Sequence, residues 1–318
     1  MTAMGRKRVL VAVPVLLGLP VALALSEAVS FHIRNRTNGT LVSSGMERDY
    51  LLHVPPTHDR TRPTPLVISL HGAGGWPVQQ MELTRWNRLA DEHGFIVVYP
   101  SGIASAGPRV WHTEGTSLAR DVGFISELID TLEAGYNIDP ERIYANGISN
   151  GGGMSFVLSC MLSDRIAAVG MVGAAQTLPW SWCTDHGPVP MIAFHGTADP
   201  MIPYDGGRSP IADNWFPKIP TWTANWARRN RCGMVPVETA VAADVTRIEY
   251  PGCADGADVV LFRIQGGGHT WPGGEPLPKW FVGPTSNGVD ATRQMWEFFR
   301  EHPLARRESV RPQSRLPG

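Results

Sequence analysis

A serine at position 149 stands between two glycines, Gly147 and Gly151, in a pattern that can make it a nucleophile. A strand-like run at 142–145 precedes it, and a helix-like run at 152–158 follows it. At a sharp turn from strand to helix the serine takes a strained backbone conformation, which only small neighbours allow. The amides of the helix N-terminus then point to where negative charge develops when a carbonyl is attacked. The pattern therefore predicts acyl transfer through Ser149.

The serine hydroxyl needs a base to remove its proton, and a histidine suits this role at neutral pH. His269 follows a strand-like run at 259–264, and Asp199 follows another at 190–194. An aspartate in such a site fixes the tautomer of the histidine and stabilises the imidazolium that forms. Because the order serine, aspartate, histidine is the one that α/β-hydrolases use, we predict Ser149, Asp199 and His269 as a catalytic triad.

Other histidines and aspartates compete for these roles. His71 and His195 lie in turns directly after strand-like runs, and we interpret both as side chains that support their loops. His112, in a segment with no assigned element, remains an alternative base. The rival acids, none of which directly follows a buried strand, are Asp205, Asp255 and Asp258.

The oxyanion of a tetrahedral intermediate needs two backbone amides near the nucleophile. One is expected from Asn150, the residue after the serine. The glycine-rich turn at 71–75 follows the first buried strand, and we expect its Ala73 to supply the second amide, with Gly74 as the next choice. The alternative interpretation of this segment is an ordinary turn.

The elements around these residues alternate between strands and helices. Apolar runs predict strands at 50–54, 65–70, 95–100, 142–145, 167–172, 190–194 and 259–264. Apolar residues at helical spacing predict helices near 80–93, 121–135 and 289–301, beside the one that follows Ser149. This alternation predicts the α/β-hydrolase fold, a mostly parallel central sheet with helices on both faces. Ligand sites in such sheets form beyond the carboxyl ends of the strands, where all three triad candidates fall.

The chain has 318 residues, 43% of them hydrophobic, and a formal net charge of -1. This balance gives no basic field, so we expect no nucleic-acid partner. Positive charges at positions 6–8 precede an uncharged apolar stretch at 9–25, which predicts a secretory signal peptide over 1–26. A membrane anchor is the alternative, although the stretch is slightly short for a span. After cleavage we expect a secreted protein without a stable membrane partner, with a catalytic domain at 29–303 and a disordered tail at 304–318.

Four cysteines fall in the expected mature chain, and an even number in an exported protein predicts two disulfides. The sequence permits three connectivities. We favour Cys160–Cys183 and Cys232–Cys253, because each pair closes a short local loop. A zinc site is the rival interpretation, but no ligand spacing typical of zinc occurs. No metal and no organic cofactor is predicted.

Five motifs resemble those of the secreted α/β-hydrolase esterases of the polyhydroxybutyrate depolymerase-like family, close to the feruloyl and acetylxylan carbohydrate esterases. The His-Thr-Trp-Pro-Gly run that begins at His269 is the most specific of them. By this resemblance Ser149, Asp199 and His269 are the triad, and the cysteines pair as favoured above. The chain departs from the family at Arg120, where an acidic residue is usual, and at Ala73, where many relatives have cysteine. The five motifs lie at 70–75, 121–125, 146–152, 194–200 and 267–273.

We therefore expect a secreted serine esterase that hydrolyses carboxylic esters through an acyl-enzyme. The resemblance implies a polyhydroxyalkanoate-type polyester, or feruloyl or acetyl esters of plant polysaccharide, as the substrate. The alternatives are an acyltransferase on the same triad and a non-catalytic polymer-binding protein on a hydrolase scaffold. Of the 11 tryptophans, Trp271 lies two residues from His269 and is the expected substrate contact. The Pro-, Gly- and Trp-rich stretch 204–230 is expected to form a wall or lid over the site.

Overall fold

The computed structural model divides into two compact units, Met1–Arg36 and Thr37–Gly318, and the elements below all belong to the second. The predicted signal peptide, 1–26, and all but the first residue of the predicted tail, 304–318, lie outside the described residues. No helix within the described residues is long and apolar enough to cross a membrane. The structure describes residues 36–104, 108–115, 117–183, 187–210 and 214–304.

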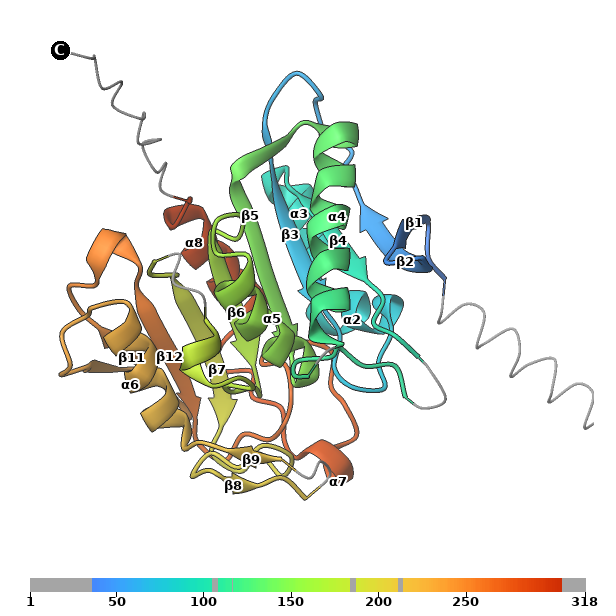
Figure 1. Ribbon diagram of the computed structural model, residues 1–318. Coiled ribbons are helices and arrows are strands. Elements are labelled where there is room, and N and C mark those ends of the chain that lie inside the picture. The colour runs from blue at the N-terminus through green and yellow to red at the C-terminus, as the bar shows by residue number, and fades with distance from the viewer. Residues whose placement is uncertain (1–35, 105–107, 116, 184–186, 211–213, 305–318) are drawn as a thin grey trace, which may run out of the picture. The chain divides into compact units, whose positions relative to one another are not determined.

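A ten-stranded sheet forms the middle layer of this unit (Figure 1), in the order β1-β2-β4-β3-β5-β6-β7-β12-β11-β10. Its central strands, which are parallel, are β3 (Thr64–Leu70), β4 (Ile96–Pro100), β5 (Ile138–Ile148), β6 (Ala168–Val172), β7 (Met191–Gly196) and β12 (Val259–Ile264). Antiparallel strands extend both edges: β2 (Met46–His53) and β1 (Gly39–Ser43) beside β4, and β11 (Val245–Tyr250) and β10 (Val237–Ala242) beside β12. The predicted α/β-hydrolase fold, with its mostly parallel sheet, is confirmed.

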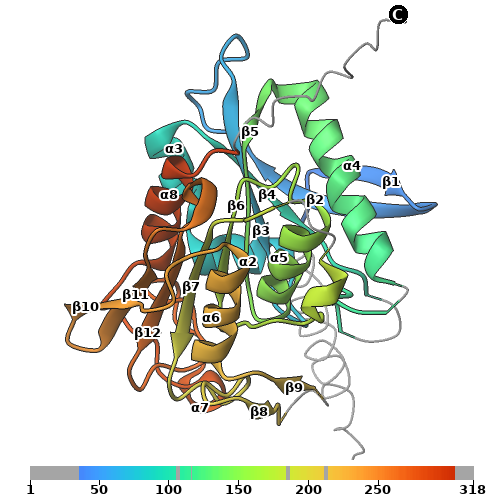
Figure 2. The same cartoon turned by 60° about the vertical axis from the view of Figure 1, so that its left-hand side comes forward.

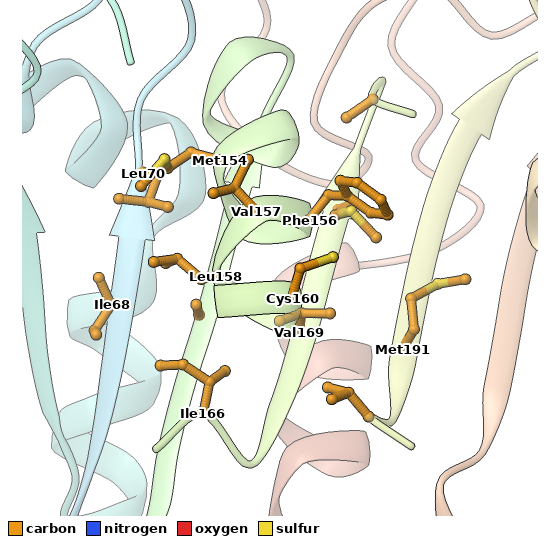
Figure 3. Close-up of a cluster of buried hydrophobic side chains, with 14 of the residues drawn as sticks. Ile68, Leu70, Met154, Phe156, Val157, Leu158, Cys160, Ile166, Val169 and Met191 are labelled. Atoms are coloured by element: carbon orange, nitrogen blue, oxygen red, sulfur yellow. The ribbon is translucent and has the colours of Figure 1, made fainter. Parts of the chain in front are cut away.

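Helices cover both faces of the sheet (Figure 2), because successive side chains of each buried strand point to opposite faces. On one face, Ile68 and Leu70 of β3 share an apolar cluster with Met154 and Leu158 (Figure 3). On the other face, Val67 shares a cluster with Trp86. The helices of the first cluster are α4 (Leu118–Tyr136), α5 (Asn150–Met161) and α6 (Ile219–Arg229). Those of the second are α2 (Pro77–Thr84), α3 (Trp86–His93) and α8 (Ala291–Glu301).

One predicted helix and one predicted wall take other forms. The helix expected over 80–93 is divided at Arg85, whose left-handed backbone (φ 57°) ends α2 and precedes α3. The stretch 204–230, expected as a wall or lid, contains α6, in which Trp222 and Trp226 are fully buried. Because α6 packs both indoles into the core, the prediction of a lid is wrong for this part of the stretch.

Short elements lie near the carboxyl ends of the parallel strands. Both views place α7 (Lys279–Val282) beside the small hairpin of β8 (Gly207–Arg208) and β9 (Trp215–Phe216) (Figures 1 and 2). These elements come from the segments that follow β7 and β12. They therefore surround the edge of the sheet at which the predicted triad lies.

Both predicted disulfides are present, which settles the connectivity that the sequence left open. Cys160–Cys183 joins the last turn of α5 to the segment after β6, and Cys232–Cys253 joins the segment after α6 to the one after β11. No free cysteine occurs in the described part of the chain. The same part holds no cluster of three or more His, Cys, Asp or Glu side chains that could bind a metal ion.

Candidate active site

Ser149 lies at the turn between β5 and α5, with backbone angles φ 55° and ψ -122°. Such a positive φ is strained for a residue with a side chain. Close contacts on both sides fix this turn. A Cβ atom at Gly147 would lie 2.4 Å from the backbone carbon of Gly151, and one at Gly151 would lie 2.2 Å from the carbonyl oxygen of Leu70. The two glycines are therefore required by packing, and the turn presents the serine at the end of the strand.

Asp199 and His269 meet at the ends of two neighbouring strands. Asp199 follows β7 and His269 follows β12, and these strands pair in parallel, so their carboxyl ends lie side by side. His269 Nδ1 donates a hydrogen bond of 2.8 Å to Asp199 Oδ2. Asp199 Oδ1 accepts from the backbone amides of Met201 (2.8 Å) and Ile202 (2.9 Å). The carboxylate therefore orients the imidazole and organises its own loop.

The surroundings of Asp199 favour its ionised form. Burial acts to raise the pKa of this carboxyl, but the hydrogen bond and charge of His269, with smaller contributions from His195 and the Ile202 amide, lower its pKa overall. His195 Nε2 donates to the carbonyl oxygen of Ile202 (2.9 Å) and lies 3.5 Å from Asp199 Oδ2. Burial lowers the pKa of His195, so this side chain is neutral at neutral pH. Its contacts agree with the predicted role in supporting the loop.

Ser149 and His269 line the same cavity, which has a volume of ≈ 280 Å³. Within the described structure no hydrogen bond joins the Ser149 hydroxyl to His269. Apolar side chains form most of the remaining wall, and Phe281 of α7 stands at its edge with 51% of its surface exposed. The other apolar members of this wall are Leu83, Ile148, Met201, Leu277, Pro278 and Val282.

Backbone hydrogen bonds in the glycine-rich turn distinguish between Ala73 and Gly74, the two residues considered for the second amide that binds the oxyanion. The Gly74 amide donates to the carbonyl oxygen of Arg109 (2.7 Å), so it is already used. The Ala73 amide donates to no backbone carbonyl of the described residues, and Ala73 lines the cavity beside Ser149. Asn150 is the first residue of α5, where an amide has no acceptor within its own helix. The structure therefore leaves the Ala73 and Asn150 amides available beside the serine.

His71 fixes the loop that carries Ala73. Its Nδ1 donates to the Gly72 carbonyl oxygen (2.7 Å), and its Nε2 accepts from the Gly102 amide (3.0 Å). Burial lowers the pKa of His71 to about 4, so the ring is neutral at pH 7. Trp111 Nε1 donates to the His71 carbonyl oxygen (3.0 Å) from the segment that passes over this loop. These contacts agree with the support role predicted for His71.

Trp271 does not line the cavity that contains Ser149 and His269. The side chain is 0% exposed, and its Nε1 donates to Thr292 Oγ1 of α8 (2.9 Å). Thr292 Oγ1 in turn donates to the Thr84 carbonyl oxygen at the end of α2 (2.6 Å). The indole thus holds the chain after His269 against two helices, and the expectation that it contacts the substrate is corrected.

A second cavity of ≈ 340 Å³ is lined by Ser149 but not by His269, and its lining was not foreseen from the sequence. The segment 108–115 forms one wall. The Asn150 side chain holds this segment: its Oδ1 accepts from the Trp111 amide (2.7 Å) and its Nδ2 donates to the Trp111 carbonyl oxygen (2.9 Å). Because Asn150 follows Ser149 directly, this one residue links the turn that carries the serine to the wall of the second cavity.

His112, the alternative base, lies in this wall and not beside Asp199. Its backbone amide and its Nδ1 both donate to Asp121 Oδ2, at 2.8 Å and 2.9 Å. Arg48 Nη2 donates to Asp121 Oδ1 at 2.8 Å. Burial lowers the pKa of Arg48 despite the opposing effect of Asp121, and the guanidinium stays charged. Arg48 is 5% exposed and Asp121 0%, so the second aspartate–histidine pair rests on a buried ion pair.

Comparisons with known proteins find similar sequences and a similar fold. The family model described as "Esterase PHB depolymerase" matches residues 48–177. The protein named "Putative esterase NocK" of Nocardia uniformis subsp. tsuyamanensis is 31% identical over 278 residues, which cover 81% of this chain and 80% of NocK. "Feruloyl esterase D" of Neurospora crassa is 28% identical over 280 residues, which cover 84% of this chain and 86% of that protein. The solved acetyl xylan esterase from Aspergillus awamori has the same fold, with a TM-score of 0.58 and 15% identity over 73% of this chain and 93% of that one.

Proposed function

The chain belongs to the esterase family named for polyhydroxybutyrate depolymerase, and from this we propose that it hydrolyses carboxylic esters with Ser149 as the nucleophile. One observation carries the proposal. His269, which is hydrogen-bonded to Asp199 (2.8 Å), lines the same cavity as Ser149, and Ser149 lies in a strained turn. A buried, oriented imidazole on the same cavity as the partly buried Ser149 supports acyl transfer.

In the acylation step, the Ser149 oxygen attacks the ester carbonyl while His269 Nε2 accepts the hydroxyl proton. The Asp199 carboxylate holds Nδ1–H and stabilises the imidazolium that forms. The amides of Ala73 and Asn150 donate hydrogen bonds to the oxyanion. His269 then returns the proton to the departing alcohol oxygen, which leaves an acyl group on Ser149.

In the deacylation step, His269 removes a proton from water, and the resulting hydroxide attacks the acyl-enzyme. The second tetrahedral intermediate uses the same two amides, and its collapse releases the acid and restores the Ser149 hydroxyl. An alcohol in place of water would make the protein an acyltransferase. Product analysis with and without an added sugar or alcohol separates these outcomes.

The substrate proposed from the relatives is a feruloyl or acetyl ester of plant polysaccharide, with a polyhydroxyalkanoate-type polyester as the second class. Two cavities, of ≈ 280 Å³ and ≈ 340 Å³, meet at Ser149 and offer separate space to the two halves of an ester. Secretion is part of the same proposal. The sequence pattern at 1–26 and the two disulfides support an oxidising compartment outside the cytoplasm.

Replacing Ser149 by alanine tests the mechanism. We expect Ser149→Ala to lower kcat for a short p-nitrophenyl ester by at least about 10³-fold, because the nucleophile is lost. The variant should melt as the parent does and should not be labelled by a fluorophosphonate. A matched control is Ser155→Ala in the same helix, since the Ser155 hydroxyl bonds only the Gly151 carbonyl oxygen (3.1 Å) and should be dispensable. Retained turnover in Ser149→Ala would exclude the assignment.

A hydrolysis panel tests the substrate. It compares polyhydroxybutyrate, feruloylated arabinoxylan, acetylated xylan and simple short-chain esters, each against the Ser149→Ala protein as the blank. We expect a polysaccharide ester to have the highest kcat/KM. A clear preference for simple short-chain esters over all three polymers would contradict both proposed substrate classes.

A further inference from the structure

Two cavities meet at Ser149 and are lined by different side chains. Among their described lining residues they share Ala73, Ser149 and Met201. The cavity that contains His269 has the apolar side chains described above. The second cavity also has apolar side chains, and beside them it carries hydrogen-bonding ones: His112, Thr113, Glu114, Thr177, Ser209 and Asn214. The two halves of an ester bound at Ser149 therefore meet different surroundings.

The position of His269 assigns the halves to the cavities. In the tetrahedral intermediate the departing alcohol oxygen must receive its proton from His269, so this oxygen faces the imidazole. His269 lines the first cavity and is not part of the lining of the second. The alcohol half consequently extends along the first cavity. The acid half then points into the second cavity, toward His112.

The hydrogen bonds of His112 define what its ring can offer to the acid half. Asp121 accepts from Arg48 on one oxygen and from the His112 amide on the other, so it acts as a carboxylate acceptor. His112 Nδ1, 2.9 Å from Asp121 Oδ2, therefore donates to this carboxylate. An imidazole that donates from Nδ1 has its lone pair on Nε2, and this nitrogen accepts a hydrogen bond.

The other nitrogen of His112, Nε2, is the one left for a bound substrate. His112 lines the second cavity with 30% of its side chain exposed, and its Nδ1 bonds the buried Asp121. Among the described residues Nε2 has no hydrogen-bond partner. The ring is held in place on one edge and open on the other, which is how a fixed recognition group is built. Glu114, on the same wall, adds a second acceptor.

We propose that His112, positioned by Asp121, is a specificity-determining residue that accepts a hydrogen bond from a hydroxyl group on the acid half of the ester. The proposal rests on the proposed function of Ser149. It narrows the acid half to hydroxylated acids, whether the hydroxyl is phenolic or aliphatic. It also gives the ester a direction across Ser149, with the acid toward His112 and the alcohol toward Phe281.

Two pairs of esters test the proposal on the full chain. In each pair the alcohol is the same and only one acid carries the hydroxyl: methyl 4-hydroxycinnamate with methyl cinnamate, and ethyl 3-hydroxybutyrate with ethyl butyrate. We expect at least one hydroxylated ester to have a kcat/KM about 3- to 10-fold above its partner, the usual effect of one hydrogen bond. A third pair, with the hydroxyl on the alcohol, should show no such preference. Preference in the third pair alone would overturn the assignment of the halves.

The variant His112→Phe keeps a ring of similar size and removes both nitrogens, so the ratio within a pair should fall to about one. The matched control is His53→Phe, because His53 also pairs with an aspartate, Asp91 at 2.8 Å, but lines neither cavity. This control should keep the ratio of the parent. If His112→Phe fails to fold, His112→Lys, which keeps a donor for Asp121 and has no acceptor, should likewise abolish the preference.

The outcomes separate this proposal from the one on which it rests. A parent ratio near one in both acid pairs, or a ratio that survives both His112→Phe and His112→Lys, excludes the role of His112. In either case hydrolysis that still depends on Ser149 leaves the esterase mechanism intact. Absence of hydrolysis for every ester contradicts the proposed function itself.

Discussion

Two aspartate–histidine pairs flank Ser149, and their geometry is almost the same. The Asp199–His269 distance is 2.8 Å and the Asp121–His112 distance is 2.9 Å. Both aspartate side chains are 0% exposed, and in both pairs the histidine uses Nδ1. Distances within the pair therefore do not separate the general base that we propose from the recognition group that we propose.

The neighbours of each aspartate make the difference. Arg48 lies 2.8 Å from Asp121 and balances its charge. Among the described residues, the partners of Asp199 other than His269 are backbone amides and neutral His195, so its charge remains for the His269 imidazolium. A charge on His269 is thus stabilised when it forms, whereas one on His112 faces a pair that is already neutral. The comparison shows that the partner behind the aspartate decides what the histidine can do.

The largest expected effect is a difference in kcat between variants of the two aspartates. Asp199→Asn should lower kcat for a short p-nitrophenyl ester by about 10³- to 10⁴-fold, because the amide neither fixes the right tautomer nor stabilises the imidazolium. Asp121→Asn should lower kcat by less than about 10-fold in the folded fraction, since its histidine transfers no proton. Steady-state kinetics, normalised to sites titrated with a fluorophosphonate, gives both values. Equal losses in the two variants would contradict the distinction.

The next effect concerns the cation behind Asp121. Arg48→Met leaves a buried carboxylate without its ion-pair partner and should lower the free energy of unfolding by about 3–5 kcal/mol. Urea denaturation measures it. The control is Arg293→Met, which removes an exposed pair with Glu92 (47% exposed on both sides) and should cost no more than about 1 kcal/mol. The double variant Arg48→Met/Asp121→Asn removes both charges and should recover much of the lost stability. If Arg48→Met and the double variant are equally stable, Arg48 does not balance the charge of Asp121.

The smallest effect probes the space around each pair. Gly173 has φ 51°, and a Cβ there would lie 2.9 Å from His269 Nδ1 and 3.3 Å from Asp199 Oδ2. Gly173→Ala should therefore displace the imidazole and lower kcat by about 10- to 100-fold. Gly123, two residues after Asp121 in α4, has no atom within 4 Å of such a Cβ. Gly123→Ala should keep kcat and raise the free energy of unfolding by up to about 1 kcal/mol. An unchanged kcat in Gly173→Ala would mean that the pair tolerates the displacement.

The sequence predicted one of the two pairs, and the reason is the topology. Asp199 and His269 each follow an apolar run that reads as a buried strand, and parallel strands bring such ends together. Asp121 pairs instead with Arg48, 73 residues away on the antiparallel strand β2, and nothing in local periodicity links a helix start to that strand. The pairing of His112 with Asp121 depends on a loop with no periodic pattern at all.

Other differences have equally local causes. Nearness to His269 along the chain suggested a substrate contact for Trp271, but sequence distance does not give the direction of a side chain, and this indole points at α8. The break at Arg85 needs a left-handed residue, and arginine carries no signal for that conformation. The edge strand β10 escaped prediction because its side chains are almost all exposed and show no apolar face.

The close packing of the turn at Ser149 also limits which substitutions this chain can accept during evolution. Because a side chain at Gly147 or Gly151 would collide with the backbone, any lineage that keeps the fold must keep those glycines, whether or not it keeps the reaction. The serine between them is under no such constraint from packing. In descendants that lose the activity, the two glycines would therefore remain, and a substitution at position 149 would mark the loss of catalysis.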